Sequence, residues 1–189
     1  MRRLTKVALV AISLSMLVNV NANAHGGATG VVKERMTIME TLGKSLKELT
    51  AMMRGKTPYE PERVRQIARQ MSSHGGDSMT KLFPKDSLDK PSEARPNIWT
   101  QWGKFEGLAS QLTSYAKALE KSANNKRGAS TSGGMPQVQG MMNNSGMMTN
   151  MPEADPELLA NMPPDAAYIH ITQTCGSCHE GFRKPKNDT

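Results

Sequence analysis

The residues best suited to chemistry lie near the C-terminus, where Cys175, Cys178 and His179 form a C-x-x-C-H sequence. Residues at positions i and i+3 of a helix lie on one face, so both sulfurs can reach the two vinyl groups of one porphyrin. The resulting thioethers hold the ring, and the adjacent His179 offers a nitrogen to the iron as its proximal ligand. The small residues Gly176 and Ser177 let the macrocycle approach closely. The spacing therefore predicts one covalently attached haem c.

Two other uses of the cysteine pair fit the sequence less well. A thiol–disulfide redox pair belongs in a βαβ unit, and no alternation of β-branched and polar residues predicts a strand. A structural zinc ion needs four ligands, whereas this motif offers three. Haem attachment is therefore the favoured interpretation.

Four stretches with apolar residues at helical spacing must position this motif. They cover residues 30–54, 61–74, 97 to about 123, and 166 to about 183. In the first and third stretches the apolar positions step by 3 and 4, which is the seam spacing of a bundle helix. Asp165 is the expected N-cap of the fourth helix. Residues 77–96, rich in proline and turn residues, are expected to form an ordered connection.

The segment between the third and fourth helices, residues 124–162, has a different composition. It is rich in Gly, Ser and Asn and holds seven methionines. Residues 155–159 predict a short helix with Asp155 as its cap and Pro156 at its first position, and the rest of the segment is expected to be flexible. The sequence thus predicts an all-α fold, an antiparallel up-down-up-down four-helix bundle with a Met/Gly/Asn-rich insert between helices three and four.

The first 24 residues read as a cleaved signal peptide. Three basic residues precede an apolar stretch, residues 7–18, which is too short for a comfortable membrane span. Residues 22–24, Ala-Asn-Ala, supply a cleavage site, although a single membrane anchor is the alternative. We therefore expect a mature chain of residues 25–189, located in the periplasm and without a membrane span.

The charge of the mature chain says little about its partners. Removing residues 1–24 takes away three basic and no acidic residues, so the net charge falls from +7 to +4. This mild excess favours acidic partners weakly. No basic run with interleaved aromatic residues indicates nucleic-acid binding.

The chain resembles class II c-type cytochromes, meaning the cytochrome c′ family and its low-spin, methionine-ligated relatives. The resemblance rests on the C-x-x-C-H motif close to the C-terminus, and it covers roughly residues 30–123 and 165–186. Further matching positions are Arg35, Arg54-Gly55, Leu82-Phe83-Pro84, Pro96-x-Ile98-Trp99 and Glu180-Gly181-Phe182-Arg183. It implies a four-helix bundle, a topology for which cytochrome c′ is a standard example, and often a homodimer. The insert has no counterpart in the usual pattern.

The resemblance also bears on Arg183, four residues after His179. It implies that Arg183 is the basic residue beside the proximal ligand and contributes to the haem site. The alternative is a solvated charge at the C-terminus of a helix.

Met39 is the expected iron ligand on the face opposite His179. In an up-down-up-down bundle the end of the fourth helix lies beside the start of the first, where Met39 occupies the inward seam. The resemblance implies the same residue, because the distal position lies four residues after Arg35. Met52 and Met53 fall roughly 20 Å further along the helix. A seam-facing core methionine without a ligand role is the alternative for Met39.

The other histidines are weaker candidates for iron ligands. His170 precedes His179 by 2.5 turns and should point away from the ring. His74 falls at the haem end of the second helix, beside two glycines, where a surface role is favoured. His25 would be the frayed N-terminus of the mature chain.

The predicted function is electron transfer by a periplasmic mono-haem cytochrome that is not an enzyme and that acts with redox partner proteins. The resemblance implies that a methionine at the distal position accompanies electron carriers. A five-coordinate haem protein that binds small gases such as NO or CO is the alternative. A third interpretation is copper handling by the insert, since thioethers select Cu(I), although regular Met-x-x-Met repeats are missing.

Overall fold

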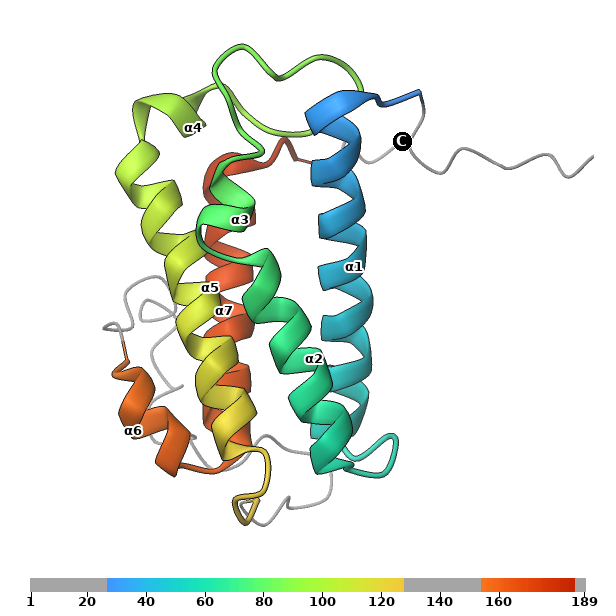
Figure 1. Cartoon of the computed structure of the whole chain (residues 1–189), viewed down its shortest axis with the longest axis vertical. Coiled ribbons are helices and arrows are strands. Elements are labelled where there is room, and N and C mark those ends of the chain that lie inside the picture. The colour runs from blue at the N-terminus through green and yellow to red at the C-terminus, as the bar shows by residue number, and fades with distance from the viewer. Residues whose placement is uncertain (1–26, 128–153, 186–189) are drawn as a thin grey trace, which may run out of the picture.

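The computed structural model describes residues 27–127 and 154–185, and this part of the chain contains seven helices. They are α1 (Gly30–Met53), α2 (Pro61–His74), α3 (Asp77–Thr80), α4 (Asn97–Thr100), α5 (Trp102–Ser122), α6 (Pro156–Asn161) and α7 (Pro164–Phe182). The long helices α1, α2, α5 and α7 run alternately down and up and form an antiparallel bundle (Figure 1). The predicted fold is confirmed. Within the described residues, none of the helices combines the length and apolar character that a membrane span requires.

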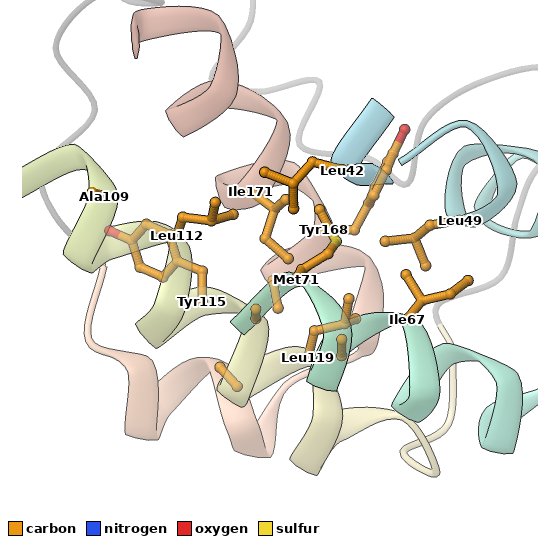
Figure 2. Packing of buried hydrophobic residues seen from close by; sticks show 14 of the residues in the cluster. Leu42, Leu49, Ile67, Met71, Ala109, Leu112, Tyr115, Leu119, Tyr168 and Ile171 are labelled. Carbon is orange, nitrogen blue, oxygen red and sulfur yellow. The ribbon is translucent and has the colours of Figure 1, made fainter. Parts of the chain in front are cut away.

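The core lies between these four helices. Leu49 of α1, Ile67 of α2, Leu119 of α5 and Ile171 of α7 are almost completely buried, and Figure 2 shows their side chains converging. The predicted seam residues therefore face inward, which is how an amphipathic helix gains most of its stability. The same seams continue to the end of the bundle where α1 begins and α7 ends.

Three local details differ from the sequence prediction. A single helical turn, α3, interrupts the segment expected to be a connection. The third predicted helix is split at Gln101, whose φ of −118° and ψ of 37° are not helical. Asp165 is not the N-cap of α7, because the helix starts at Pro164 and the Asp165 carboxylate pairs with Arg127 instead.

The ends of the insert that the structure describes pack on the bundle. The Asp155 side chain caps α6 by accepting from the backbone N–H of Glu157 at 2.9 Å, as the sequence predicts. The Asn125 amide donates to the carbonyls of Ala160 and Met162. The remainder of the insert, residues 128–153, lies outside the described residues, as do residues 1–26, which include the expected signal peptide, residues 1–24.

Gly75 ends α2 at a close approach to the backbone of α5. The N–H of Gly76 donates to the carbonyl of Ala109 at 2.7 Å. A Cβ at Gly75 would lie 2.4 Å from Oγ1 of Thr113 and 3.1 Å from the carbonyl oxygen of Ala109. Only a residue without a side chain therefore fits between the two helices.

We expect Gly75→Ala to lower the free energy of unfolding by about 1–3 kcal/mol, the usual effect of overpacking. Urea unfolding measures this change. Gly107→Ala is the control, because a Cβ there meets nothing within 4 Å, and it should stabilise α5 by up to about 1 kcal/mol. Equal effects of the two substitutions would contradict the close contact.

Candidate functional site

A cavity of about 440 Å³ lies at the end of the bundle where α1 begins and α7 ends. It takes its walls from α1, from the connection between α3 and α4, from α4 and α5, and from the C-terminal end of α7. The lining residues are Val32, Arg35, Met36, Met39, Glu40, Gly43, Phe83, Ser92, Glu93, Ala94, Ile98, Phe105, Cys178, His179, Phe182 and Arg183. Its volume falls in the range of small-molecule and cofactor sites.

The C-x-x-C-H sequence lies on α7, as predicted. Cys178 lines the cavity, and Cys175, one turn earlier, is half-buried in the same way. Burial raises the pKa of each thiol to about 11, so both are protonated at neutral pH. The spacing of i and i+3 places both sulfurs on one face of α7.

His179 is exposed at the mouth of this cavity. The surrounding protein nevertheless desolvates its ring in part, which lowers its pKa. The positive charge of Arg183 lowers this pKa further, and the negative charge of Glu93 opposes the effect. A lowered pKa keeps the imidazole neutral, which is the form that binds a metal ion.

Met39 projects from α1 into the same cavity and is partly buried. Met36, one turn earlier, also lines it. Met52 and Met53 are buried at the other end of α1, where their carbonyls accept from Arg127. The structure thus brings Met39, but not Met52 or Met53, to the cavity that His179 lines.

The remaining described histidines lie elsewhere. His74 lines a separate hollow of about 430 Å³ with Lys33 and Lys81. His170 packs against the Tyr115 ring with 5.2 Å between ring centroids. His25 lies outside the described residues. Neither His74 nor His170 is among the residues that line the larger cavity.

Arg35 is the residue whose importance the helical pattern alone did not reveal. Its side chain is buried, with 5% exposure, and its guanidinium carbon lies 4.3 Å from the centre of the Phe83 ring. Nη2 donates to the carbonyl of Ser87 at 2.6 Å, whereas buried Nε has no partner among the residues that the structure describes. A buried cation with an unused donor beside a cavity indicates an anionic group there. The signal available in the sequence was a charged residue on the apolar seam, between Val32 and Met39.

Aromatic side chains form the floor of the cavity. Phe105 contacts Phe83 and Phe182 edge to face, with ring centroids 4.8 and 5.6 Å apart. Trp102 packs against Phe105 at 5.5 Å, and Trp99 donates its indole N–H to the carbonyl of Phe83 at 3.0 Å. The cavity therefore offers apolar walls, one buried cation, the thiol of Cys178 and the two expected iron ligands, His179 and Met39, with Cys175 one turn earlier on α7. These features fit haem, a flat apolar ring with carboxylate substituents and a central iron.

Comparisons with known proteins agree with this chemistry. The family model described as Cytochrome C' matches residues 30–144, a range that stops short of the C-x-x-C-H motif. Cytochrome c′ of Rhodopseudomonas palustris is 28% identical over 93 residues, which cover 49% of this chain and 63% of the relative. This chain therefore spans less than two thirds of that relative.

The chain is also similar, over longer alignments, to another group of cytochromes. Cytochrome c-556 of Rhodopseudomonas palustris is 25% identical over 168 residues, covering 86% of this chain and 88% of the relative. Cytochrome c-556 of Agrobacterium tumefaciens is 25% identical over 162 residues, covering 83% of this chain and 99% of the relative. Among solved structures, cytochrome c′ of Rhodopseudomonas palustris superposes with a TM-score of 0.59 at 22% identity and covers 85% of this chain and all of its own. The shared fold is thus the four-helix bundle.

Proposed function

The chain belongs to the cytochrome c′ family, and on this premise we propose that it is an exported mono-haem electron carrier whose iron is bound by His179 and Met39. Members of the family carry one covalent haem c. The observation that carries the proposal is that Met39 on α1 and His179 on α7 line one cavity. When bound, haem supplies an Fe(III)/Fe(II) couple that accepts and donates one electron.

We assign a separate task to each side chain. Cys175 and Cys178 form the two thioethers, and the neutral imidazole of His179 binds the iron from α7. Met39 binds it from α1, and a methionine ligand paired with histidine raises the reduction potential. The unused Nε of Arg35 would hold a carboxylate of the haem.

The apolar floor of the cavity supports electron transfer in a second way. The rings of Phe83, Phe105 and Phe182 exclude water from the side of the cavity that faces the core. A dry environment raises the free energy of the more highly charged oxidised iron and so tunes the potential. We therefore assign electron transfer to the site, with no role in enzyme catalysis.

We also propose the wider setting of the protein. Residues 1–24 act as a signal peptide, and residues 25–189 form the periplasmic cytochrome with 124–162 as its insert. Redox partners with an acidic surface suit its net positive charge. A homodimer is supported by one structural relative, which is described as a cytochrome c′ with ligand-controlled dimer dissociation.

A five-coordinate, gas-binding protein is the second candidate. It is favoured by a structural relative from Alcaligenes xylosoxidans, a mutant cytochrome c′ described as a nitric oxide complex. In that case His179 would be the single protein ligand to the iron and Met39 a core residue. Copper handling by the insert depends on residues 128–153, which lie outside the described residues.

We expect the exported protein to have the mass of residues 25–189 plus one haem. Acid–acetone should leave this haem on the chain, because thioether bonds survive the extraction. Mass spectrometry of the protein before and after extraction measures whether the haem stays attached. Replacing both Cys175 and Cys178 with serine should make all haem extractable. An unshifted mass, or extractable haem in the unsubstituted protein, would overturn covalent attachment.

A further inference from the structure

The C-terminal end of α7 is joined to the connection between α3 and α4 by backbone hydrogen bonds. The N–H of Lys184 donates to the carbonyl of Glu93 at 2.7 Å, and the N–H of Arg95 donates to the carbonyl of Phe182 at 2.9 Å. These bonds form an antiparallel bridge between Ala94 and Arg183. We call residues 92–97 the rim strap; three of them, residues 92–94, line the cavity.

A side-chain ion pair reinforces this bridge. Nε of Arg183 donates to Oε2 of Glu93 at 2.6 Å, and Nη2 contacts the same oxygen. The pair is partly exposed, and such pairs contribute little to global stability. The backbone bridge already aligns the two residues, however, so little conformational entropy opposes the pairing.

The ion pair acts on the helical turn that carries His179. The N–H of Arg183 donates to the carbonyl of His179 at 3.0 Å, which makes Arg183 the C-cap of α7. Helix ends fray when nothing holds them. The Arg183 side chain reaches across to Glu93, and Asn97 donates to the carbonyl of Gly181 at 3.1 Å. The rim strap therefore contacts the last turn of α7 through backbone bonds, through Asn97 and through the Glu93–Arg183 ion pair.

We propose that Glu93 is a positioning residue for His179, which it holds in place through Arg183 and the last turn of α7. The proposal rests on the proposed role of His179 as proximal ligand. The Glu93 carboxylate holds the Arg183 guanidinium in place. Because Arg183 is the C-cap of α7, this contact restrains the last helical turn and with it the direction of the His179 imidazole. Glu93 lines the cavity, and its charge also acts on the His179 ring. The role proposed here is separate from that charge effect: Glu93 holds the last turn of α7 through Arg183.

The first test measures opening of the strap by amide hydrogen exchange in the holoprotein. In Glu93→Gln the N–H groups of Arg95 and Lys184 should exchange about fivefold faster. A partly exposed ion pair shifts the equilibrium between the closed and the open strap by about this factor at most. Glu180→Gln is the matched control, because it removes the same charge one residue from His179, on a side chain that does not line the cavity. It should leave both amides at the wild-type rate.

The second test records the iron–histidine stretching band of the ferrous protein by resonance Raman spectroscopy, in the Met39→Ala background. Glu93→Gln should shift or broaden this band, whereas Glu180→Gln should not. Combining Glu93→Arg with Arg183→Glu restores the pair with reversed polarity and should return both the band and the exchange rates toward their original values.

Two outcomes would overturn the proposal. Exchange rates like those of wild type in Glu93→Gln would show that the ion pair does not hold the strap. Faster exchange with an unchanged iron–histidine band would show that the strap serves structure alone. A ferrous variant that is high-spin and five-coordinate but has no iron–histidine band would instead contradict the role of His179, and with it the proposed function.

Discussion

Replacing Met39 with alanine is expected to open one axial site on the iron while the haem remains attached. Alanine offers no sulfur, so a low-spin oxidised protein should become high-spin and lose the weak far-red methionine–iron charge-transfer band. The reduction potential should fall, because methionine ligation favours the ferrous state. Carbon monoxide should bind rapidly to the ferrous variant. Absorption spectra and a redox titration measure all four changes.

Met53→Ala is the matched control for Met39→Ala. Met53 lies on the same helix, is 6% exposed and belongs to the core at the far end of the bundle. Its loss should lower the free energy of unfolding by about 2–5 kcal/mol and leave the visible spectrum unchanged. A low-spin spectrum that survives Met39→Ala would contradict ligation by Met39. Met36, which lines the same cavity, would then be the first replacement to examine, ahead of His74.

Arg127→Ala is expected to cause the largest loss of stability. The Arg127 guanidinium donates to both carboxylate oxygens of Asp165, at 3.0 and 2.6 Å, and to the carbonyls of Met52 and Met53 at 3.2 and 2.7 Å. It also lies 4.8 Å from the centre of the Tyr59 ring. Alanine would leave the buried Asp165 carboxylate without its cation and the last carbonyls of α1 without a donor. Breaking a buried pair in this way typically costs about 3–5 kcal/mol.

Urea unfolding measures the effect of Arg127→Ala, and the haem spectrum should stay unchanged because the substitution lies at the opposite end of α1 from Met39. Arg63→Ala is the control. Arg63 pairs with Glu48, but both side chains are more than 40% exposed, so its loss should cost less than about 1 kcal/mol. Similar losses in the free energy of unfolding for the two variants would show that the contacts of Arg127 do not stabilise this end of the bundle.

The positions that the sequence predicted well are those fixed by helical periodicity. Met39 lies at the cavity that His179 lines for two reasons. The rise and rotation per residue of a helix fix how far along the axis and on which face a side chain lies, and the antiparallel order fixes which helix ends are neighbours. Met52 and Met53 were excluded by the same reasoning, and the structure places them at the far end. Leu49, Leu119 and Ile171 face the core for the same reason.

The features that the sequence did not reveal depend on contacts between distant residues. Arg183 pairs with Glu93, 90 residues earlier in the chain. Local sequence patterns do not predict a partner so far away in the sequence. Asp165 has the side chain of an N-cap, but a tertiary ion pair with Arg127 outweighs that local preference. The break at Gln101 likewise lies within an uninterrupted 3–4 apolar pattern, which cannot show where backbone dihedrals depart from helical values.

The absorption spectrum of the wild-type protein, recorded oxidised and then reduced with and without carbon monoxide, tests ligation by His179 and Met39 most directly. We expect a low-spin spectrum in both oxidation states, a far-red methionine–iron band in the oxidised protein, and slow, weak uptake of carbon monoxide. A high-spin spectrum with rapid carbon monoxide binding would contradict the paired ligands and identify the cavity as an open gas-binding site.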